Sequence, residues 1–474
     1  MHLIGSASRR EFLKRAAALG SLGSAAPFAL NLAGIGSAAA ATMPSDYKAL
    51  VCVFLNGGND HNNTVIPYDT GSHATYAAAR GGLVSAGGIA LDRTGLLEIV
   101  PTTSQGSGRQ FAVSAELAPL QALFAANKAA VMANVGPLIT PITNAAQYKA
   151  GTVAAPPKLF SHNDQQATWQ AFSPEGGKVG WGGRLGDMFA AANSNTIFTA
   201  ISASGNTVFL SGQNIFQYQI GTSGATAISG TTSTNLFGSG NGASSGANVL
   251  KSLTQQSSSQ VLEQDHASVV TRSIGAASQV STALATVPAT DSRVALGAQA
   301  NNRLAQQLQI VARLIAVNTT LGAKRQVFFV SLGGFDTHDN QITAQASLHT
   351  QLAGAINYFY QATVNLGVAN QATLFTASDF GRTLTSNGDG SDHGWGAHHF
   401  VVGGAVKGGD IYGTFPVVAM GTTDDVGSGR LLPRSSVDQY ASTMAKWFGV
   451  SDSELSLIAP NIGNFSTRDL GFML

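Results

Sequence analysis

Tyr47-Lys48-Ala49-Leu50-Val51-Cys52-Val53-Phe54-Leu55 is a continuous apolar run, and the turn-forming residues Asn56-Gly57-Gly58-Asn59-Asp60 end it. The run shows no alternation of polar and apolar residues. It therefore predicts a strand buried on both faces, as in a parallel sheet. Cys52, the one cysteine of the chain, lies inside this run. We expect it to be a buried apolar residue and not a nucleophile or a ligand.

The same pattern returns along the chain. Apolar runs predict further buried strands at 129–136, 326–332 and 372–377, and helical periodicity precedes them at 117–126, 295–315 and 344–366. Alternating helices and buried strands predict an α/β fold with a mostly parallel central sheet flanked by helices. A last helix is predicted at 436–448.

Residues 201–247 break this rhythm. They are dense in Gly, Ser, Thr and Asn, with short alternating pieces between. This composition predicts a loop-rich β insertion or cap over one edge of the core, and a flexible linker is the alternative. Residues 43–474 are accordingly expected to form one α/β domain that carries an insertion at about 201–247.

The first 42 residues have the composition of an export signal. An arginine pair lies in Ser8-Arg9-Arg10-Glu11-Phe12-Leu13-Lys14, an apolar stretch covers 16–35, and small residues follow at 37–41. These features predict a twin-arginine signal, export by the Tat translocase and a periplasmic or secreted mature protein, with a Sec signal as the alternative. No later apolar run reaches the length of a membrane span, so none is expected in the mature form.

Composition narrows the classes of partner. Charged residues make up 11% of the chain and the formal net charge is +1. Without a basic block, nucleic-acid binding is not expected. The hydrophobic fraction of 44% is sufficient for a large core, so the surface must be covered mainly by neutral polar residues and glycine.

Three predicted strands run directly into an acid, namely Asp60, Asp336 and Asp379. In an open parallel sheet the carboxyl ends of the strands line one crevice, so these acids can converge. Six of the 10 histidines lie close to the same strand ends: His61, His162, His338, His393, His398 and His399. Carboxylates beside imidazoles are the ligands of zinc, manganese or iron, which predicts a divalent metal site. The alternative is that the acids form turns and helix N-caps.

The segment 389–399 holds three histidines that compete as ligands. His398 and His399 are adjacent and should point in different directions, so at most one of them is a ligand, and His393 competes with both. Glycines around them allow close approach of the backbone to a ligand. The predicted metal ligands are thus Asp60, Asp336, His338 and Asp379, with His393 or His398.

Two further residues are candidates for catalysis. Arg382 follows Asp379 closely and can clamp an anionic group through two hydrogen bonds, or form an ordinary ion pair. Ser161 precedes a predicted helix, where an anionic oxygen is favoured, and is the candidate nucleophile. A routine helix cap is the alternative for Ser161. The chain has no Gly-x-Ser-x-Gly elbow, no Walker A loop and no dinucleotide fingerprint after the first strand.

Four ordered motifs resemble those of the DUF1501 family of uncharacterised, mostly exported bacterial proteins: Leu55-Asn56-Gly57-Gly58-Asn59-Asp60, Leu332-Gly333-Gly334-Phe335-Asp336-Thr337-His338, Ser378-Asp379-Phe380-Gly381-Arg382-Thr383 and Asp392-His393-Gly394-Trp395-Gly396. That family is grouped with the alkaline phosphatase and sulfatase superfamily, which implies an α/β fold and a site for two metals.

The resemblance implies a role for each candidate. Asp60 and Asp379 would hold one metal; Asp336, His338 and a histidine of 393–399 would hold the other. Ser161 would take the place of the nucleophile. The expected function is an exported, metal-dependent hydrolase of phosphate or sulfate esters that acts on a small anionic ester. The alternative is a non-catalytic exported protein that keeps the fold to bind glycans or a cell-envelope partner.

Overall fold

The computed structural model describes residues 44–474, with the exceptions of 107, 229, 232–245 and 257–258. The predicted export signal at 1–42 lies outside the described residues, as does part of the segment 201–247. In the part of the chain that the structure describes, no helix is both long enough and apolar enough to cross a membrane.

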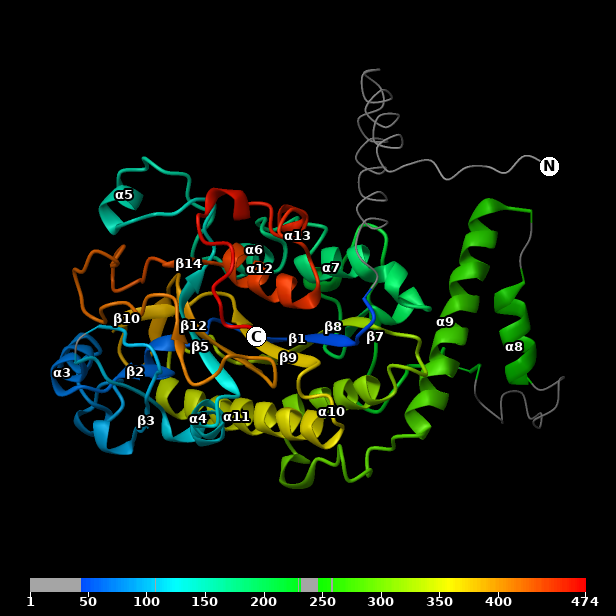
Figure 1. Ribbon diagram of the computed structural model, residues 1–474, viewed down its shortest axis with the longest axis horizontal. Helices are drawn as coiled ribbons and strands as arrows, with labels where there is room; N and C mark the ends of the chain where they lie inside the picture. The colour runs from blue at the N-terminus through cyan, green and yellow to red at the C-terminus, as the bar shows by residue number, and fades with distance from the viewer. Residues whose placement is uncertain (1–43, 107, 229, 232–245, 257–258) are drawn as a thin grey trace, which may run out of the picture.

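A large central sheet runs through the molecule (Figure 1). Its strands, in spatial order, are β13 (Ile411–Tyr412), β5 (Ala129–Gly136), β12 (Ala397–Gly403), β9 (Ala372–Ser378), β1 (Lys48–Asn56), β8 (Arg325–Gly333), β6 (Ala200–Ser202) and β7 (Tyr218–Gln219), and β14 (Ser435–Ser436) pairs with β5. β12 is antiparallel to both of its neighbours, whereas the other pairs of this sheet are parallel. The predicted α/β fold with a mostly parallel sheet is confirmed.

β1 lies at the centre of this sheet. It pairs in parallel with β8 from Lys48 opposite Arg325 and with β9 as far as Leu55 opposite Ser378. Each residue of β1 between its two ends is buried, as the unbroken apolar run predicts for a strand covered on both faces.

Helices cover the two faces. Ala49, Val51 and Val53 belong to one core, and Leu50, Cys52 and Phe54 belong to the other, because successive side chains of a strand point to opposite faces. The first core is closed by α4 (Ala118–Ala125), α9 (Val261–Ala285), α10 (Arg303–Ala316) and α11 (Gln341–Asn365). The second core is closed by α6 (His162–Ala171), α7 (Trp181–Phe189), α12 (Val437–Phe448) and α13 (Leu455–Ile458).

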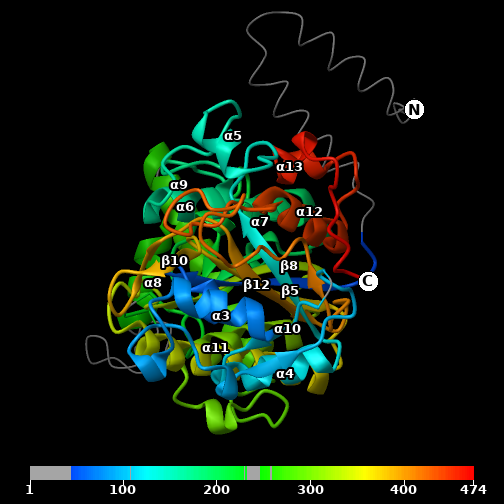
Figure 2. The ribbon, with the colours of Figure 1, turned by 90° about the vertical axis from the view of Figure 1, so that its left-hand side faces the viewer.

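Smaller elements surround the carboxyl ends of the central strands. A three-stranded antiparallel sheet is formed by β2 (Val65–Pro67), β4 (Phe111–Val113) and β3 (Leu97–Ile99), and β10 (Arg382–Ser386) pairs with β11 (Ser391–His393). Figure 2 looks toward this side, with α3 (Thr70–Ala79) in front of the sheet and the two helical layers above and below it. The remaining helices are α5 (Ala145–Lys149) and α8 (Gly246–Gln255), of which α8 contacts α9.

The described part of the segment 201–247 continues the central sheet. β6 pairs with β8, and β7 pairs with β6 at the edge. The segment therefore contributes sheet structure next to the core, together with the loop that joins β6 and β7.

Asp438 in α12 supplies a test of the helical packing. Its carboxylate accepts the Asn461 N–H at 2.8 Å, and burial raises its pKa from the ordinary 3.8 to about 6. The folded protein then binds this proton more tightly than the unfolded chain, so this contribution to stability is present at low pH and is lost as pH rises through 6. Between pH 4 and pH 7 we expect the unfolding free energy of the wild type to fall by about 2 kcal/mol relative to Asp438→Asn. Urea unfolding at both pH values measures this, and a constant difference contradicts it.

Candidate metal centre

Three loops meet at the carboxyl ends of β1, β8 and β9. The parallel registers place Asn56 beside Gly333 and Leu55 beside Ser378, so the chain leaves all three strands at one edge. Gly57 lies directly against the loop after β8, with φ +115°, and a Cβ at this position would collide with the backbone nitrogen of Asp336. A glycine is therefore required for the first two loops to touch.

The carboxylate of Asp336 lies among three imidazoles. Its Oδ1 is 3.1 Å from Nε2 of His338 and 3.4 Å from Nε2 of His393, and its Oδ2 is 3.4 Å from Nε2 of His162. Candidate ligand atoms of His162, Asp336 and His393 all lie within 4.8 Å of one another. The four side chains are 24% to 45% exposed, so the cluster is open to solvent on one side.

Each imidazole of the cluster is held from behind through its Nδ1. Nδ1 of His162 is 2.7 Å from Oδ2 of Asp379, Nδ1 of His338 is 3.1 Å from Oδ1 of Asp392, and Nδ1 of His393 is 2.8 Å from the carbonyl oxygen of Phe160. Because these oxygens accept hydrogen bonds, we assign the proton to Nδ1 in each ring. In the neutral ring the lone pair is then on Nε2, which faces Asp336.

With the proton on Nδ1, the Nε2 atoms of the three imidazoles have no hydrogen-bond donor opposite them. Nε2 of His338 and Nε2 of His393 are 2.9 Å apart, and Nε2 of His162 is buried and makes no hydrogen bond. Two lone pairs that face each other require a cation or a shared proton between them. Metal-binding histidines are held in this way, with Nδ1–H donated to a carboxylate or a carbonyl. Three imidazole nitrogens and a carboxylate fit zinc or a similar divalent ion.

The charges around the cluster follow from these contacts. The hydrogen bond to Asp379 raises the pKa of His162, whereas burial lowers the pKa of His393. Burial would raise the pKa of Asp336, but the hydrogen bond and the charge of Arg382 outweigh this, and the pKa is lowered. Asp336 is thus ionised at neutral pH.

Asp379 lies behind the cluster and not in it. It is fully buried; Oδ1 accepts the Gly57 N–H at 3.1 Å, and Oδ2 accepts from Nε2 of Gln166 at 2.7 Å as well as facing His162. His162 and Gln166 lie four residues apart in α6 and so reach Asp379 from one face of the helix. The structure therefore uses Asp379 to orient His162.

Phe380 forms an apolar wall beside the imidazoles. Its buried ring lies 4.8 Å from the ring of His162 and 4.5 Å from the ring of His393, measured between centroids. This packing fixes two of the rings in the plane that their Nδ1 hydrogen bonds require.

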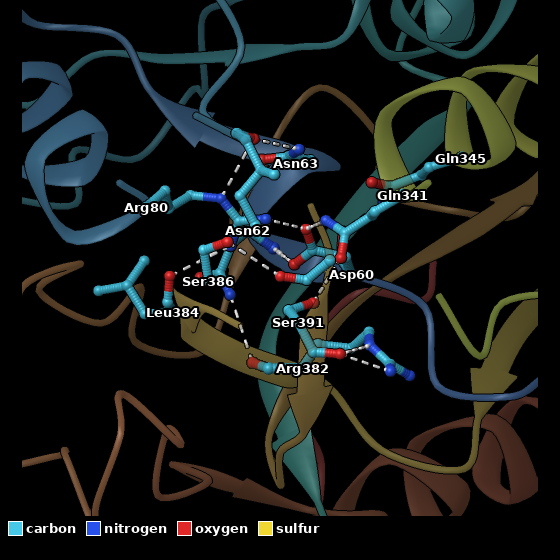
Figure 3. A network of polar contacts seen from close by, with 12 residues as sticks. Asp60, Asn62, Asn63, Arg80, Gln341, Gln345, Arg382, Leu384, Ser386 and Ser391 are labelled. Atoms are coloured by element: carbon cyan, nitrogen blue, oxygen red, sulfur yellow. Dashed lines mark hydrogen bonds and ion pairs between the residues drawn. The ribbon is translucent and has the colours of Figure 1, made fainter. Parts of the chain in front are cut away.

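Asp60 is fully buried in a network of polar contacts behind the cluster, which reaches Arg382 through Gln341 and Ser391 (Figure 3). Its Oδ2 accepts from Arg80, with which it forms an ion pair, and from Nε2 of Gln341 at 2.5 Å; its Oδ1 accepts the Asn62 N–H at 3.1 Å. A guanidinium thus lies against the carboxylate for which the resemblance implies a metal. These contacts do not fit a second metal shared by Asp60 and Asp379.

Arg382 is also fully buried, and its guanidinium is bound by the protein. Nη1 donates to the carbonyl oxygen of Gly57 at 2.9 Å and to Oδ1 of Asp336 at 3.1 Å, and Nη2 donates to the carbonyl oxygen of Ser391 at 2.6 Å. In this arrangement Arg382 positions Asp336 through an ion pair, the second of the two roles expected for it.

Of the three histidines at 389–399, His393 is the one that reaches the cluster. His398 lies buried in β12, where Nδ1 accepts the Asn134 N–H at 3.0 Å and the ring stacks on Phe415. Burial lowers the pKa of His398 well below its ordinary value. His399 is buried on the other side of the same strand, in ring contact with Trp169.

Ser161 occupies the N-cap position of α6, directly before His162. Its hydroxyl donates to Oδ2 of Asp164 at 2.9 Å and does not accept a capping hydrogen bond from the backbone. Ser161 is half-buried and lies at the start of α6, the helix that carries His162.

Sequence reasoning noticed His162 among the histidines but gave it no role, and it assigned none to Gln166 or Arg80. The signal that could have identified His162 and Gln166 is their spacing of four residues in a predicted helix. For Arg80 the sequence offered no motif.

Comparison with known families agrees with the four motifs. The profile of DUF1501, described as a protein of unknown function, matches residues 47–457. The chain belongs to the DUF1501 family. The matched range includes all four residues of the cluster in this DUF1501 protein: His162, Asp336, His338 and His393. No curated protein matches the chain.

The Asp60–Arg80 pair yields a stability prediction. Arg80→Met leaves a buried carboxylate without its charge partner, which costs about 3–5 kcal/mol of unfolding free energy. Urea unfolding measures the loss. The double variant Arg80→Met/Asp60→Asn removes both charges and should recover a large part of it. If Arg80→Met is as stable as the wild type, the ion pair does not have the role described.

Proposed function

We propose that this DUF1501 protein is a metal-dependent hydrolase whose divalent ion is held by His162, Asp336 and His393, with His338 as a fourth ligand. One observation carries the proposal: three imidazoles place Nδ1 within hydrogen-bond distance of an oxygen acceptor and turn Nε2 toward one ionised carboxylate. With the proton on Nδ1, this set places several acceptors together, and a bound cation would satisfy all of them.

The metal and the chain have separate tasks in this proposal. A bound divalent ion would act as a Lewis acid toward an ester oxygen. Asp379 holds His162, Arg382 holds Asp336, and Phe380 keeps two rings in place. The exposed side of Asp336 and His338 leaves access for a substrate.

We propose a phosphate or sulfate ester as the substrate, in line with the resemblance to the alkaline phosphatase superfamily. The buried guanidinium groups of Arg80 and Arg382 are bound to Asp60 and Asp336, so the metal is the natural partner of the anionic group. Ser161 is the proposed nucleophile because it directly precedes His162. One metal per chain is proposed in place of two, since Arg80 pairs with Asp60.

We further propose that the protein is exported. The support is the arginine pair at Arg9 and Arg10, the apolar stretch at 16–35 and the small residues after it. A twin-arginine route would deliver the folded chain to the periplasm or the exterior.

Metal content tests the centre directly. After incubation with zinc and removal of free ion, we expect about one equivalent bound per chain by elemental analysis, since the donors form one set. His162→Ala and Asp336→Ala should lose most of it. His266→Ala, a change at an exposed histidine of α9, is the matched control and should keep it. Equal metal content in all four proteins would overturn the assignment.

Turnover tests the reaction. With zinc or manganese present, we expect hydrolysis of at least one of p-nitrophenyl phosphate, bis(p-nitrophenyl) phosphate and p-nitrophenyl sulfate. Asp379→Asn, which weakens the hold on His162, should lower the rate about 10–100-fold. Ser161→Ala should abolish turnover while metal content stays unchanged. Loaded protein that hydrolyses none of the three esters would favour the non-catalytic alternative, and active Ser161→Ala would assign the attack to water.

A further inference from the structure

A cleft of about 350 Å³ opens beside the metal cluster. Its walls come from the ends of β1 and β8, from α6 and from the loops at 175–177 and 204–208. The volume lies within the range of about 300–1,000 Å³ found for sites that bind small molecules.

Neutral polar groups dominate the lining of this cleft. Three serine and threonine residues line it with their hydroxyls. Five side-chain amides also line it, from Asn56, Asn163, Gln166, Gln170 and Asn206. Each amide offers both donors and acceptors, as does each hydroxyl. Among the lining residues Glu175 is the one charged side chain, and its negative charge disfavours an anionic ligand.

Two of these side chains are free to bind. The side chains of Asn56 and Asn163 make no hydrogen bond with any residue that the structure describes, and both are accessible to solvent. The buried ring of Phe329 lies in the same wall and provides an apolar surface between the polar groups. A ligand that suits this wall has hydroxyl groups on several sides and little charge.

Gln166 connects the cleft to the metal cluster. This side chain lines the cleft and donates to Oδ2 of Asp379, which in turn faces Nδ1 of His162. A ligand in the cleft therefore lies against the helix face that positions a metal ligand.

We infer that the cleft binds an uncharged saccharide, and that the substrate is a saccharide carrying the ester group. The second half of this statement rests on the proposed function, whereas the first half does not. The sugar lies against the amides of α6 and the ends of β1 and β8. Its ester group then extends toward Asp336 and His338.

Binding without metal separates the two claims. The mature protein in EDTA is titrated by calorimetry with N-acetylated chitotriose, cellotriose and maltotriose, and with inorganic phosphate as the charged comparison. We expect at least one trisaccharide to bind and phosphate to produce no heat. Asn163→Ala should weaken that binding about fivefold, as the loss of one hydrogen bond implies. Asn206→Trp, at an exposed position, should fill the cleft and abolish it.

Asn301→Ala is the matched control, because Asn301 is exposed and does not line the cleft. It should bind as the wild type does. The inference is overturned if none of the three trisaccharides binds, or if Asn163→Ala and Asn206→Trp both bind like the control. Ester turnover without saccharide binding would overturn this inference and leave the proposed function standing. Saccharide binding without metal or turnover would overturn the proposed function and the second half of the inference, and would leave the first half standing.

Discussion

The parallel register of β1 between β8 and β9 determines where the site lies. It sets Asn56 beside Gly333 and Leu55 beside Ser378, so the three loops that follow these strands begin at the same edge of the sheet. Gly57 then lets the first loop touch the second. The buried carboxylate of Asp379 joins these loops to α6 by accepting hydrogen bonds from Gly57 and Gln166. The imidazole of His162 is placed by this junction.

The fold was readable from the sequence because buried parallel strands are continuous apolar runs. β5, β8 and β9 begin or end within one residue of the predicted runs at 129–136, 326–332 and 372–377. β12 was not predicted, since its two histidines resemble site residues more than strand residues. Their burial depends on partners such as Phe415 and Trp169, which are distant in the sequence.

The site was readable in part. Asp336 and His393, which are distant in the sequence, lie close together at the edge of the sheet where the rule of converging strand ends places Asp336. It could not show that Asp60 would turn to Arg80, because an ion pair depends on where α3 ends in space. Nor could it rank Asp379 behind the cluster, since the choice between ligand and orienting group depends on a few ångströms. Charge balance explains the difference between the acids: the buried guanidinium groups of Arg80 and Arg382 pair with Asp60 and Asp336.

The central place of β1 has a consequence for folding. It is the first strand of the sheet to be synthesised, yet its partners β8 and β9 end at Gly333 and Ser378. Contacts between such distant segments close slowly, because a long loop must be ordered before they form. An apolar strand that waits for most of the chain is exposed to aggregation. Nascent chains that end before Ser378 leave β1 without one of its two partners and should therefore be clients of chaperones.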